Sequence, residues 1–420
     1  MTTQLLILGN GFDLQCGLKS SYNDFFRSAI LYASVENYGT LQLKPGVSGF
    51  WEGLLLAHYK TFGQSGYNWC DIEDIIKTTL WNICFGFNEK QTTIRHGIWS
   101  KAVEIVRARG VYFEDRAFYK EVIKDYLLDY CVSFMCGLSA EQLKNPLPSL
   151  LKKLLTELHS LEKRFCKYLK MQLFNPQNNA INEPYVVNAM NLLNELVGLR
   201  DGQYSKIKEF IHKDYREVVE KTGSAGTRRY MKMCNVLNKG FPSLRLVHIL
   251  SFNYTAIFDV LDTDSPCAYN NVHGKLCKNP CMESCESSNV IFGIDDTSIQ
   301  AQSECPDLRL FSKTYRKMFD TSNPNNILPK DDGIPIEIKF YGHSLSEADY
   351  SYFQSIFDYY HIYDNSNVSL LFYYSEGYEQ IDAIYRLINE YGSTMINQDQ
   401  GKNLIHKLLL ENRLKIIQLQ

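Results

Sequence analysis

The chain has 420 residues, 45% of them hydrophobic, enough for one large domain or for two to three ordinary domains with packed cores. Its 44 Lys and Arg residues nearly balance its 47 Asp and Glu residues, which gives a formal net charge of −3 at pH 7. This balance argues against the broad basic surface with which proteins bind duplex nucleic acid, so nucleic acid is not an expected partner.

The N-terminal residues lack the features of a signal peptide. The first four residues carry no basic side chain, and the apolar run at residues 5–8 is too short for the hydrophobic region of a signal peptide. No stretch approaches the roughly 20 apolar residues of a membrane-spanning helix. We therefore expect a cytoplasmic protein without a membrane partner, whose 12 cysteines are reduced thiols.

The first expected element is a buried strand over residues 4–8, followed by the glycine-rich segment G-N-G-F-D at 9–13. Nucleotide-binding α/β folds place their phosphate loop directly after the first strand, where glycines let the backbone come close to the ligand. The segment departs from the G-x-G-x-x-G pattern, because position 14 is Leu and the next glycine is Gly17.

Residues from about 22 to 240 show helical patterns and almost no strand-like run. Within 147–169 the apolar residues recur with a period near 3.6. Similar patterns occur at 116–134, 186–197 and 204–219. The segment W-C-D-I-E-D at 69–74 begins a further helix; the helix dipole explains its carboxylates, although a functional role for Glu73 stays open.

Strand patterns return after residue 240 and alternate with helical ones. The expected strands are 244–252, 290–294, 336–341, 368–374 and 414–419, and the expected helices are 256–261, 347–360 and 378–391. This alternation predicts an α/β fold with a mostly parallel sheet covered on both faces. The sheet domain would comprise residues 1–30 plus 241–420, with 31–240 as a large helical insertion domain after the first strand.

Two polar residues follow expected strands or turns of this sheet. Asn253, in S-F-N-Y-T, stands directly beyond a strand, where open sheets bind ligands, although an Asx turn or a helix cap at Thr255 is an equal alternative. His273 stands in N-V-H-G; the ordinary pKa of histidine lies near neutrality, which suits a general base, although a structural histidine is the commoner case.

The segment Y-G-H-S-L-S at 341–346, followed by E-A-D, predicts a strand, a turn and a helix with Ser346 as its N-cap. One interpretation is a nucleotide-contacting loop. The other is a hydrolase nucleophile elbow with Ser344 as nucleophile and His406 as base. The elbow is the weaker interpretation, because position 346 is Ser where the tight turn favours Gly.

Cys277, Cys281 and Cys285 are spaced C-x3-C-x3-C, which is not a standard zinc pattern. We interpret this stretch as a loop between strands and expect no metal, although metal binding by these cysteines stays open.

The motifs G-N-G-F-D-L, W-C-D-I-E, S-F-N-Y-T, V-H-G, I-F-G-I-D and F-Y-G-H-S-L-S-E-A-D-Y, in this order, resemble the AbiH family of bacteriophage abortive-infection proteins. That family is in turn similar to the SIR2 superfamily, whose members bind NAD in a Rossmann-like domain and, in bacterial defence, commonly hydrolyse it. The resemblance implies a Rossmann-like, SIR2-like sheet with NAD as substrate. The implied site residues are Gly9, Asn10, Gly11 and Asp13 in the cofactor loop, Asn253 and His273 for the chemistry, and Gly342 and Ser344 at the adenosine end.

The chain departs from the SIR2 pattern in three ways. Gly-Asn-Gly at 9–11 replaces the more usual Gly-Ala-Gly. Asn-Tyr-Thr, ending at Thr255, replaces the usual Asn-Tyr-Asp, and the paired C-x-x-C zinc module of the deacylating sirtuins is missing. The missing zinc module counts against protein deacylation more than against NAD cleavage.

Three functions follow as hypotheses. The first is an NAD glycohydrolase that serves phage defence, and the second is a nucleotide-sensing module without turnover. The third is a metal-dependent nuclease using Asp13, Glu73 and His273. A toxic hydrolase must be regulated, so we also expect a homo-oligomer and a phage-derived trigger.

Overall fold

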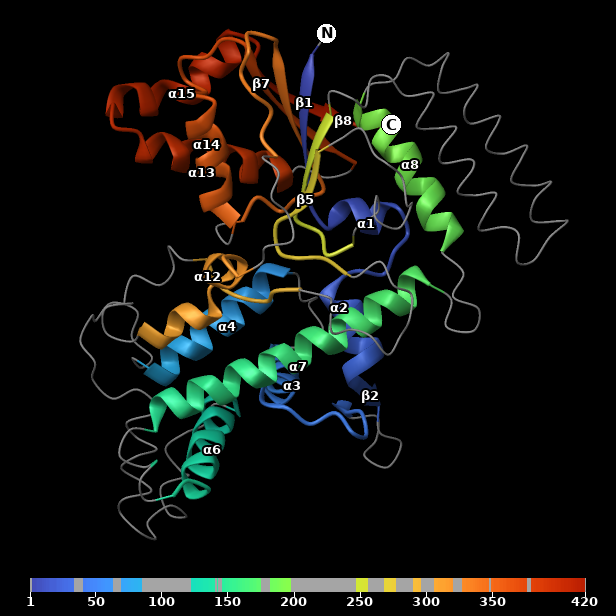
Figure 1. The fold of residues 1–420 in the computed structure, drawn as a ribbon, viewed down its shortest axis with the longest axis vertical. Helices are drawn as coiled ribbons and strands as arrows, with labels where there is room; N and C mark the ends of the chain where they lie inside the picture. The colour runs from blue at the N-terminus through green and yellow to red at the C-terminus, as the bar shows by residue number, and fades with distance from the viewer. Residues whose placement is uncertain are drawn as a thin grey trace, which may run out of the picture. The chain divides into compact units, whose positions relative to one another are not determined.

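A computed structural model of the chain describes residues 2–33, 41–62, 69–84, 122–139, 142, 146–174, 182–197, 247–255, 268–276, 290–295, 306–319, 327–346, 349–375 and 379–419. The chain divides into two compact units (Figure 1). The first comprises Met1–Ser20, Leu169–Val290 and Thr321–Gln420, and the second comprises Ser21–Tyr168 and Ile291–Asp320.

The first unit is built on a six-stranded sheet in which every described pair of neighbouring strands is parallel. Its strands are β1 (Thr3–Leu8), β4 (Val247–Ser251), β5 (Ala268–Asn271), β6 (Ile336–Tyr341), β7 (Val368–Tyr374) and β8 (Leu414–Gln418). Their order across the sheet is β5-β4-β1-β6-β7-β8. From β1 the chain passes outward to β4 and β5, and then crosses to the other side of β1 for β6, β7 and β8. This is the strand order of dinucleotide-binding folds, so the predicted α/β, Rossmann-like class is confirmed.

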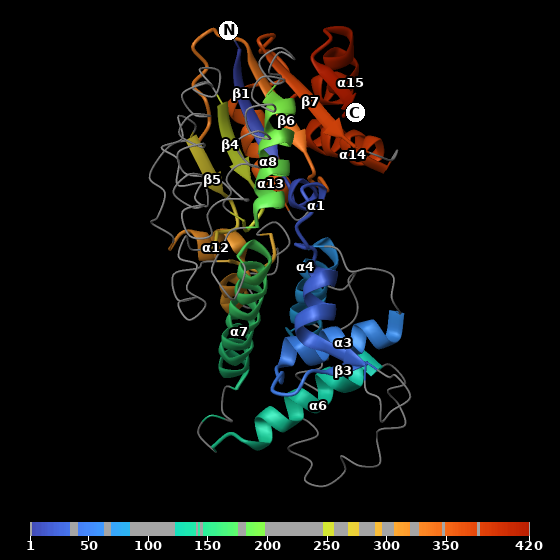
Figure 2. The same cartoon turned by 90° about the vertical axis from the view of Figure 1, so that its right-hand side faces the viewer.

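Helices cover both faces of this sheet (Figures 1 and 2). One face packs against α13 (Tyr350–Tyr359), α14 (Glu379–Thr394) and α15 (Gln398–Leu410). The other face meets α1 (Gly11–Gln15) and α8 (Glu183–Val197). In β6, I-E-I-K-F-Y, the isoleucines and Phe340 enter the core under α13, while Lys339 points the other way and donates to the Leu196 carbonyl of α8 at 2.9 Å. The alternation of side chains along each strand produces this two-sided burial.

The strands predicted at 4–8, 336–341, 368–374 and 414–419 are confirmed to within one residue at each end. The strand predicted at 290–294 is wrong, because within the described residues this segment makes a single bridge, from Ile294 to Ser312. The Phe292 N–H instead donates to the Glu162 carboxylate at 2.7 Å, which fixes this extended segment against a helix of the second unit. Strand β5 was not predicted, since A-Y-N-N lacks the β-branched run typical of strands.

The second unit is mainly helical. Its longer helices are α3 (Phe50–Phe62), α4 (Trp69–Cys84), α6 (Val122–Cys136) and residues 147–168 of α7 (Leu147–Leu173). Its shorter elements are α2 (Tyr22–Phe25), η1 (Phe26–Ile30), β2 (Leu31–Ala33), β3 (Leu41–Leu43), η8 (Pro306–Phe311) and α12 (Lys313–Lys317). The two short strands pair only with each other among the described residues, so this unit adds nothing to the six-stranded sheet.

Buried ion pairs join the segment 306–319 to the long helices of this unit. Glu162 on α7 accepts two hydrogen bonds from the Arg316 guanidinium, at 2.7 and 2.8 Å. Glu73, on the helix correctly predicted to begin at residue 69, pairs with the buried Lys313 ammonium. The Glu73 carboxylate therefore has a structural partner, which accounts for this residue without catalysis.

The two units do not follow the predicted domain limits everywhere. Helix α8, inside the predicted insertion 31–240, belongs to the first unit and covers its sheet, whereas the stretch from residue 291 to 320 belongs to the second. Residues 198–246 lie outside the described part, so the limits of the insertion stay a prediction. None of the helices in the described ranges combines the length and apolar composition needed to span a membrane.

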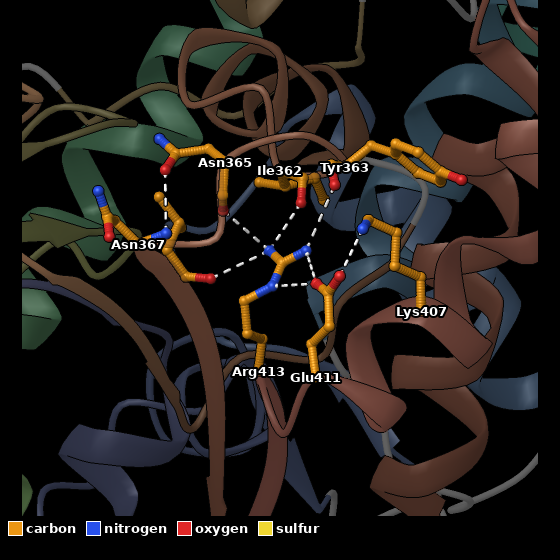
Figure 3. Close-up of polar contacts among 8 residues, drawn as sticks. Ile362, Tyr363, Asn365, Asn367, Lys407, Glu411 and Arg413 are labelled. Atoms are coloured by element: carbon orange, nitrogen blue, oxygen red, sulfur yellow. Dashed lines mark hydrogen bonds and ion pairs between the residues drawn. The ribbon is translucent and has the colours of Figure 1, made fainter.

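Arg413 directly precedes β8, the last strand of the sheet, and its side chain bonds to the turn between α13 and β7 (Figure 3). The buried guanidinium donates to the carbonyls of Ile362 at 2.8 Å, of Asn365 at 3.1 Å and of Val368 at 3.2 Å. The Glu411 carboxylate accepts from its Nε at 2.7 Å. The Arg413 side chain thus provides hydrogen-bond donors to backbone carbonyls between α13 and β7, and it links this turn to the start of β8.

We expect Arg413→Met to lower the free energy of unfolding by about 3 kcal/mol, because several buried carbonyls lose a charged donor at once. The matched control is Lys402→Met on the exposed surface of α15, which should change it by less than about 0.5 kcal/mol. Urea denaturation followed by circular dichroism measures both. Equal effects of the two substitutions would contradict the role of Arg413.

Candidate functional site

The carboxyl ends of the parallel strands share one edge of the sheet, and the predicted site residues stand on the segments that leave this edge. Gly9 to Asp13 follow β1, Asn253 follows β4, His273 follows β5, and Gly342 to Ser344 follow β6. Ligands of open parallel sheets bind at this edge, where the strand order reverses, here between β1 and β6. The strand order alone thus brings together segments that lie far apart in the sequence.

Backbone hydrogen bonds join the segment after β1 to the segment after β6. The Gly9 N–H donates to the Tyr341 carbonyl at 2.9 Å, and the Gly11 N–H donates to the Gly342 carbonyl at 2.8 Å. The Gly11 amide belongs to the segment predicted as a phosphate loop, and it is bonded within the protein.

The glycines of both segments are required by this close approach. A Cβ on Gly9 would lie 2.4 Å from the His343 Cα, and one on Gly11 would lie 2.7 Å from the Gly342 Cα. Gly342 has a φ of +67°, and a Cβ there would lie 2.4 Å from the Phe12 nitrogen. Contact between the two loops thus explains the three glycines without a ligand.

Asp13 lies under this contact and is 1% exposed. The Tyr185 hydroxyl of α8 donates to its Oδ1 at 2.7 Å, and the Thr255 hydroxyl donates to its Oδ2 at 2.6 Å. Burial raises the pKa of the Asp13 carboxyl to about 6, although both hydroxyls act in the opposite direction. The carboxylate thus ties α1 to α8 and to the segment after β4. Asn10 is also bonded internally, since its Oδ1 accepts from the Ser20 hydroxyl at 2.7 Å.

Asn253 is 3% exposed, and its backbone is held on both sides. Its N–H donates to the Ser251 hydroxyl at 3.2 Å, and its carbonyl accepts from the Asn271 side-chain amide at 2.6 Å. Its side-chain oxygen Oδ1 has no hydrogen-bond partner among the described residues. A buried acceptor left in this state costs about 1–3 kcal/mol, so a ligand group or a water molecule that donates to it would be favoured.

The alternative roles for this segment receive no support in the described part of the chain. In an Asx turn the Asn253 side-chain oxygen would accept a backbone hydrogen bond, but this oxygen has no partner among the described residues. The Thr255 hydroxyl donates to Asp13, and the backbone N–H groups that it would cap lie outside the described residues. The helix expected at 256–261 lies outside the described residues.

His273 forms a second polar cluster at the same edge. Its Nε2 lies 2.8 Å from Asp349 Oδ1, and His343 Nε2 lies 3.3 Å from Asp349 Oδ2. The Phe252 ring contacts both imidazoles edge-on, with centroid distances of 5.4 and 4.5 Å. Since His343 also adjoins Gly9 through its backbone, the cluster continues the contact between the loops after β1 and β6.

Sequence reasoning missed three of the residues that hold this site: Tyr185, His343 and Asp349. It predicted Ser346 as the N-cap of the helix that follows β6, and the N-cap residue of α13 is a different one. Helix α13 begins at Tyr350 with Asp349 at its N-cap position, and the Asp349 side chain makes no capping bond. The two imidazoles engage its carboxylate instead. The histidine in G-H-S was the available signal, because it stands at the end of a strand.

Ser344 is exposed, in the loop between β6 and α13. A nucleophile elbow requires a sharp turn from the strand directly into the helix. Here the described residues 342–346 continue from β6 without entering a helix, so the local geometry does not match an elbow.

A pocket of about 520 Å³ opens beside the switch point of the sheet. Its lining residues are Gly11, Gln15, Leu192, Glu195, Tyr341, Gly342, Tyr373, Tyr374, Ser375, Gln380 and Leu419. The Tyr341 and Ser375 hydroxyls share a hydrogen bond of 2.7 Å. Aromatic rings, amides and hydroxyls make up most of this lining, which suits a ring that carries hydrogen-bonding groups. Among the described lining residues Glu195 is the one charged member, so these residues offer no Lys or Arg to a phosphate.

Within the described ranges, no group of three or more His, Cys, Asp and Glu side chains is arranged to hold a metal ion. Of the three residues suggested for a nuclease, Glu73 pairs with Lys313, Asp13 with two hydroxyls and His273 with Asp349. Cys277, Cys281 and Cys285 lie outside the described residues.

Comparison with protein-family models matches residues 5–374 to the family described as AbiH, bacteriophage abortive infection. The matched range includes the segments that follow β1, β4, β5 and β6 at the carboxyl edge of the sheet. No curated protein and no solved structure matches the chain. The family expected from the motifs is confirmed by the first comparison.

We expect Gly342→Ala to lower the free energy of unfolding by at least about 2 kcal/mol, because it combines a strained positive φ with a collision against the Phe12 backbone. Gly333→Ala is the matched control: its φ is +85°, but a Cβ there meets nothing within 4 Å. It should cost only about 1 kcal/mol. Chemical denaturation of both variants measures the difference, and equal costs would refute the loop contact.

The raised pKa of Asp13 predicts a pH dependence of stability. The folded-state pKa of about 6 lies above the ordinary value of 3.8, so the Asp13 carboxyl binds its proton more tightly in the folded chain than in the unfolded chain. This contribution to the free energy of unfolding is fully present below the ordinary pKa and is lost as the pH rises through about 6. The free energy of unfolding of the wild type, relative to Asp13→Asn, should fall by up to about 3 kcal/mol from pH 4 to pH 7. Urea titrations at several pH values test this. A difference that does not change with pH would contradict it.

Proposed function

This chain belongs to the AbiH family of bacteriophage abortive-infection proteins, and we propose that it acts in infected cells by cleaving NAD to nicotinamide and ADP-ribose. The observation that carries the proposal is the carboxyl edge of the sheet. There a dinucleotide-type strand order places a buried amide oxygen, Asn253 Oδ1, and a histidine held by a carboxylate on neighbouring segments. A cytoplasmic location, a homo-oligomer and a phage-derived trigger belong to the same proposal.

The chemistry of NAD cleavage suits these two side chains. A water oxygen attacks C1′ of the nicotinamide ribose while the C1′–N bond breaks, and the electron pair of that bond leaves with nicotinamide. The transition state resembles an oxocarbenium ion, so the enzyme must orient the ribose and complement the developing charge. Asn253 would accept a hydrogen bond from a ribose hydroxyl or from the attacking water. His273 would take the proton of the water as general base.

The pocket beside Gly11 and Gly342 supports a nucleoside end for the same substrate. Its volume of about 520 Å³ lies within the range of small-molecule sites, and its tyrosines and amides suit a purine ring and a ribose. Ser344 would lie towards this end, as the family resemblance implies. With no Lys or Arg among the described residues of the lining, a pyrophosphate would depend on backbone N–H groups and water.

The same lining favours one alternative, a nucleotide sensor that binds without turnover. The Gly11 amide already donates to Gly342, so one of the groups expected to bind the pyrophosphate is bonded within the protein. Incubation of the purified chain with NAD, followed by chromatography, separates the two functions. Appearance of nicotinamide and ADP-ribose supports cleavage, whereas saturable binding with NAD recovered intact supports the sensor.

We expect His273→Ala and Asn253→Ala each to slow NAD loss by about 10²–10⁴-fold, because one removes the base and the other removes the group that orients the ribose or water. Ser344→Ala should lower the rate less. His406→Ala and Asn403→Ala, both on α15, are the matched controls and should keep the wild-type rate. Circular dichroism confirms that each variant is folded. Wild-type cleavage by a folded His273→Ala would end the assignment of the base, and loss of activity in His406→Ala would favour the elbow.

A further inference from the structure

The Asp349 carboxylate lies between two buried imidazoles. His273 Nε2 is 2.8 Å from one carboxylate oxygen, and His343 Nε2 is 3.3 Å from the other. The exposed fractions are 5% for His273, 7% for His343 and 8% for Asp349. The three side chains come from the segments after β5 and β6 and from the start of α13, so the chain brings them together only through the fold.

Hydrogen bonds around His343 determine where its proton lies. The Leu345 backbone N–H, which can only donate, lies 2.9 Å from His343 Nδ1, so that nitrogen accepts. A neutral His343 therefore carries its proton on Nε2 and directs it at Asp349. An ionised carboxylate only accepts, so His273 also donates to it through Nε2, and the lone pair of His273 is then on Nδ1.

We propose that Asp349 is a positioning residue, which holds His273 in the Nε2–H tautomer and thereby makes His273 Nδ1 the basic atom of the site. His343 strengthens this effect, because its protonated Nε2 faces the second carboxylate oxygen of Asp349. This nitrogen stays a donor, since His343 Nδ1 already accepts from the Leu345 N–H. A carboxylate that fixes a histidine tautomer in this way is the arrangement by which hydrolases orient their general base. The effect on catalysis rests on the proposed NAD cleavage, whereas the tautomer does not.

Aromatic packing restricts rotation of the His273 ring when its hydrogen-bond partner changes. The Phe252 and Tyr352 rings both meet the imidazole edge-on, at centroid distances of 5.4 and 5.9 Å. Rotation of the His273 ring would have to displace one of them in a packed core. A change in its hydrogen-bond partner therefore moves the proton between the two ring nitrogens more readily than it moves the ring.

Asp349→Asn tests the proposal directly, because an amide offers one acceptor and one donor where the carboxylate offers two acceptors. His343 must keep a proton on Nε2, since its Nδ1 accepts from Leu345. The amide oxygen would therefore turn towards His343 and the amide NH₂ towards His273. His273 would then accept through Nε2 and carry its own proton on Nδ1, which blocks the basic atom.

The experiment uses the full chain with ¹⁵N-labelled histidine, and long-range ¹H–¹⁵N correlation spectra at alkaline pH report the tautomer of each ring. The His273 signals are assigned by their loss in His273→Gln. We expect Nε2–H in the wild type and Nδ1–H in Asp349→Asn. In parallel, kcat for NAD cleavage should fall by about 10²–10⁴-fold in Asp349→Asn, with KM changed by less than about twofold.

A second variant provides a rescue. In Asp349→Asn combined with His343→Phe, no imidazole competes for the amide oxygen, which can turn to His273 and restore the Nε2–H tautomer. We expect that double variant to recover part of kcat relative to Asp349→Asn alone. The matched control is Asp358→Asn on the same helix, where the carboxylate accepts from the Tyr391 hydroxyl. It should leave both the tautomer and kcat unchanged.

The tautomer separates this inference from the proposed function. A wild-type His273 protonated on Nδ1, or a tautomer that Asp349→Asn does not change, overturns the positioning role whatever the activity. A tautomer that changes as expected supports the positioning role. If the wild-type chain at the same time leaves NAD intact, the proposed cleavage fails while the positioning role stands.

Discussion

The backbone contact between the segments after β1 and β6 determines the arrangement of the candidate site. It joins residues 9–11 to residues 341–343, which are separated by most of the chain, and two hydrogen bonds and three glycines hold it. Because His343 belongs to this contact, its imidazole is brought to the carboxyl edge, where it meets Asp349 and so His273. The glycines thus serve the site by letting two loops meet. A side chain at any of the three positions would separate those loops.

The sequence predicts the strands whose burial is visible locally. Five of the six carry apolar runs bounded by glycine or polar residues. The limits of four agree with the structure, and the fifth, predicted at 244–252, is β4 at Val247–Ser251. Strand β5 could not be predicted in this way, because it carries no apolar run and joins the sheet through backbone pairing with β4. The Asn271 side-chain amide adds bonds to the backbone of the segment after β4. The apolar run at 290–294 shows the opposite case, since Glu162 binds the Phe292 N–H and removes it from any sheet. Partners distant in sequence decided both outcomes.

The candidate site is predictable to a similar extent. Asn253 and His273 could be found because polar residues that follow strands reach the ligand edge of a parallel sheet. Their partners could not, because a partner is defined by the fold rather than by spacing. Tyr185 lies 172 residues from the Asp13 carboxylate that it bonds. Asp349 has the sequence context of a helix cap, and only the approach of two imidazoles gives its carboxylate another use.

The departure of this chain from the expected SIR2-like pattern at Thr255 has a physical explanation. The Thr255 hydroxyl donates to Asp13 Oδ2 at 2.6 Å, in a place closed to solvent. A carboxylate at position 255, as the Asn-Tyr-Asp pattern would supply, would face Asp13 at contact distance. Two buried carboxylates that close cannot both ionise, so one would be held protonated. Threonine supplies a donor there, and Tyr185 supplies the second. With threonine at position 255, the Asp13 carboxylate thus faces two hydroxyl donors and no second carboxylate at that position.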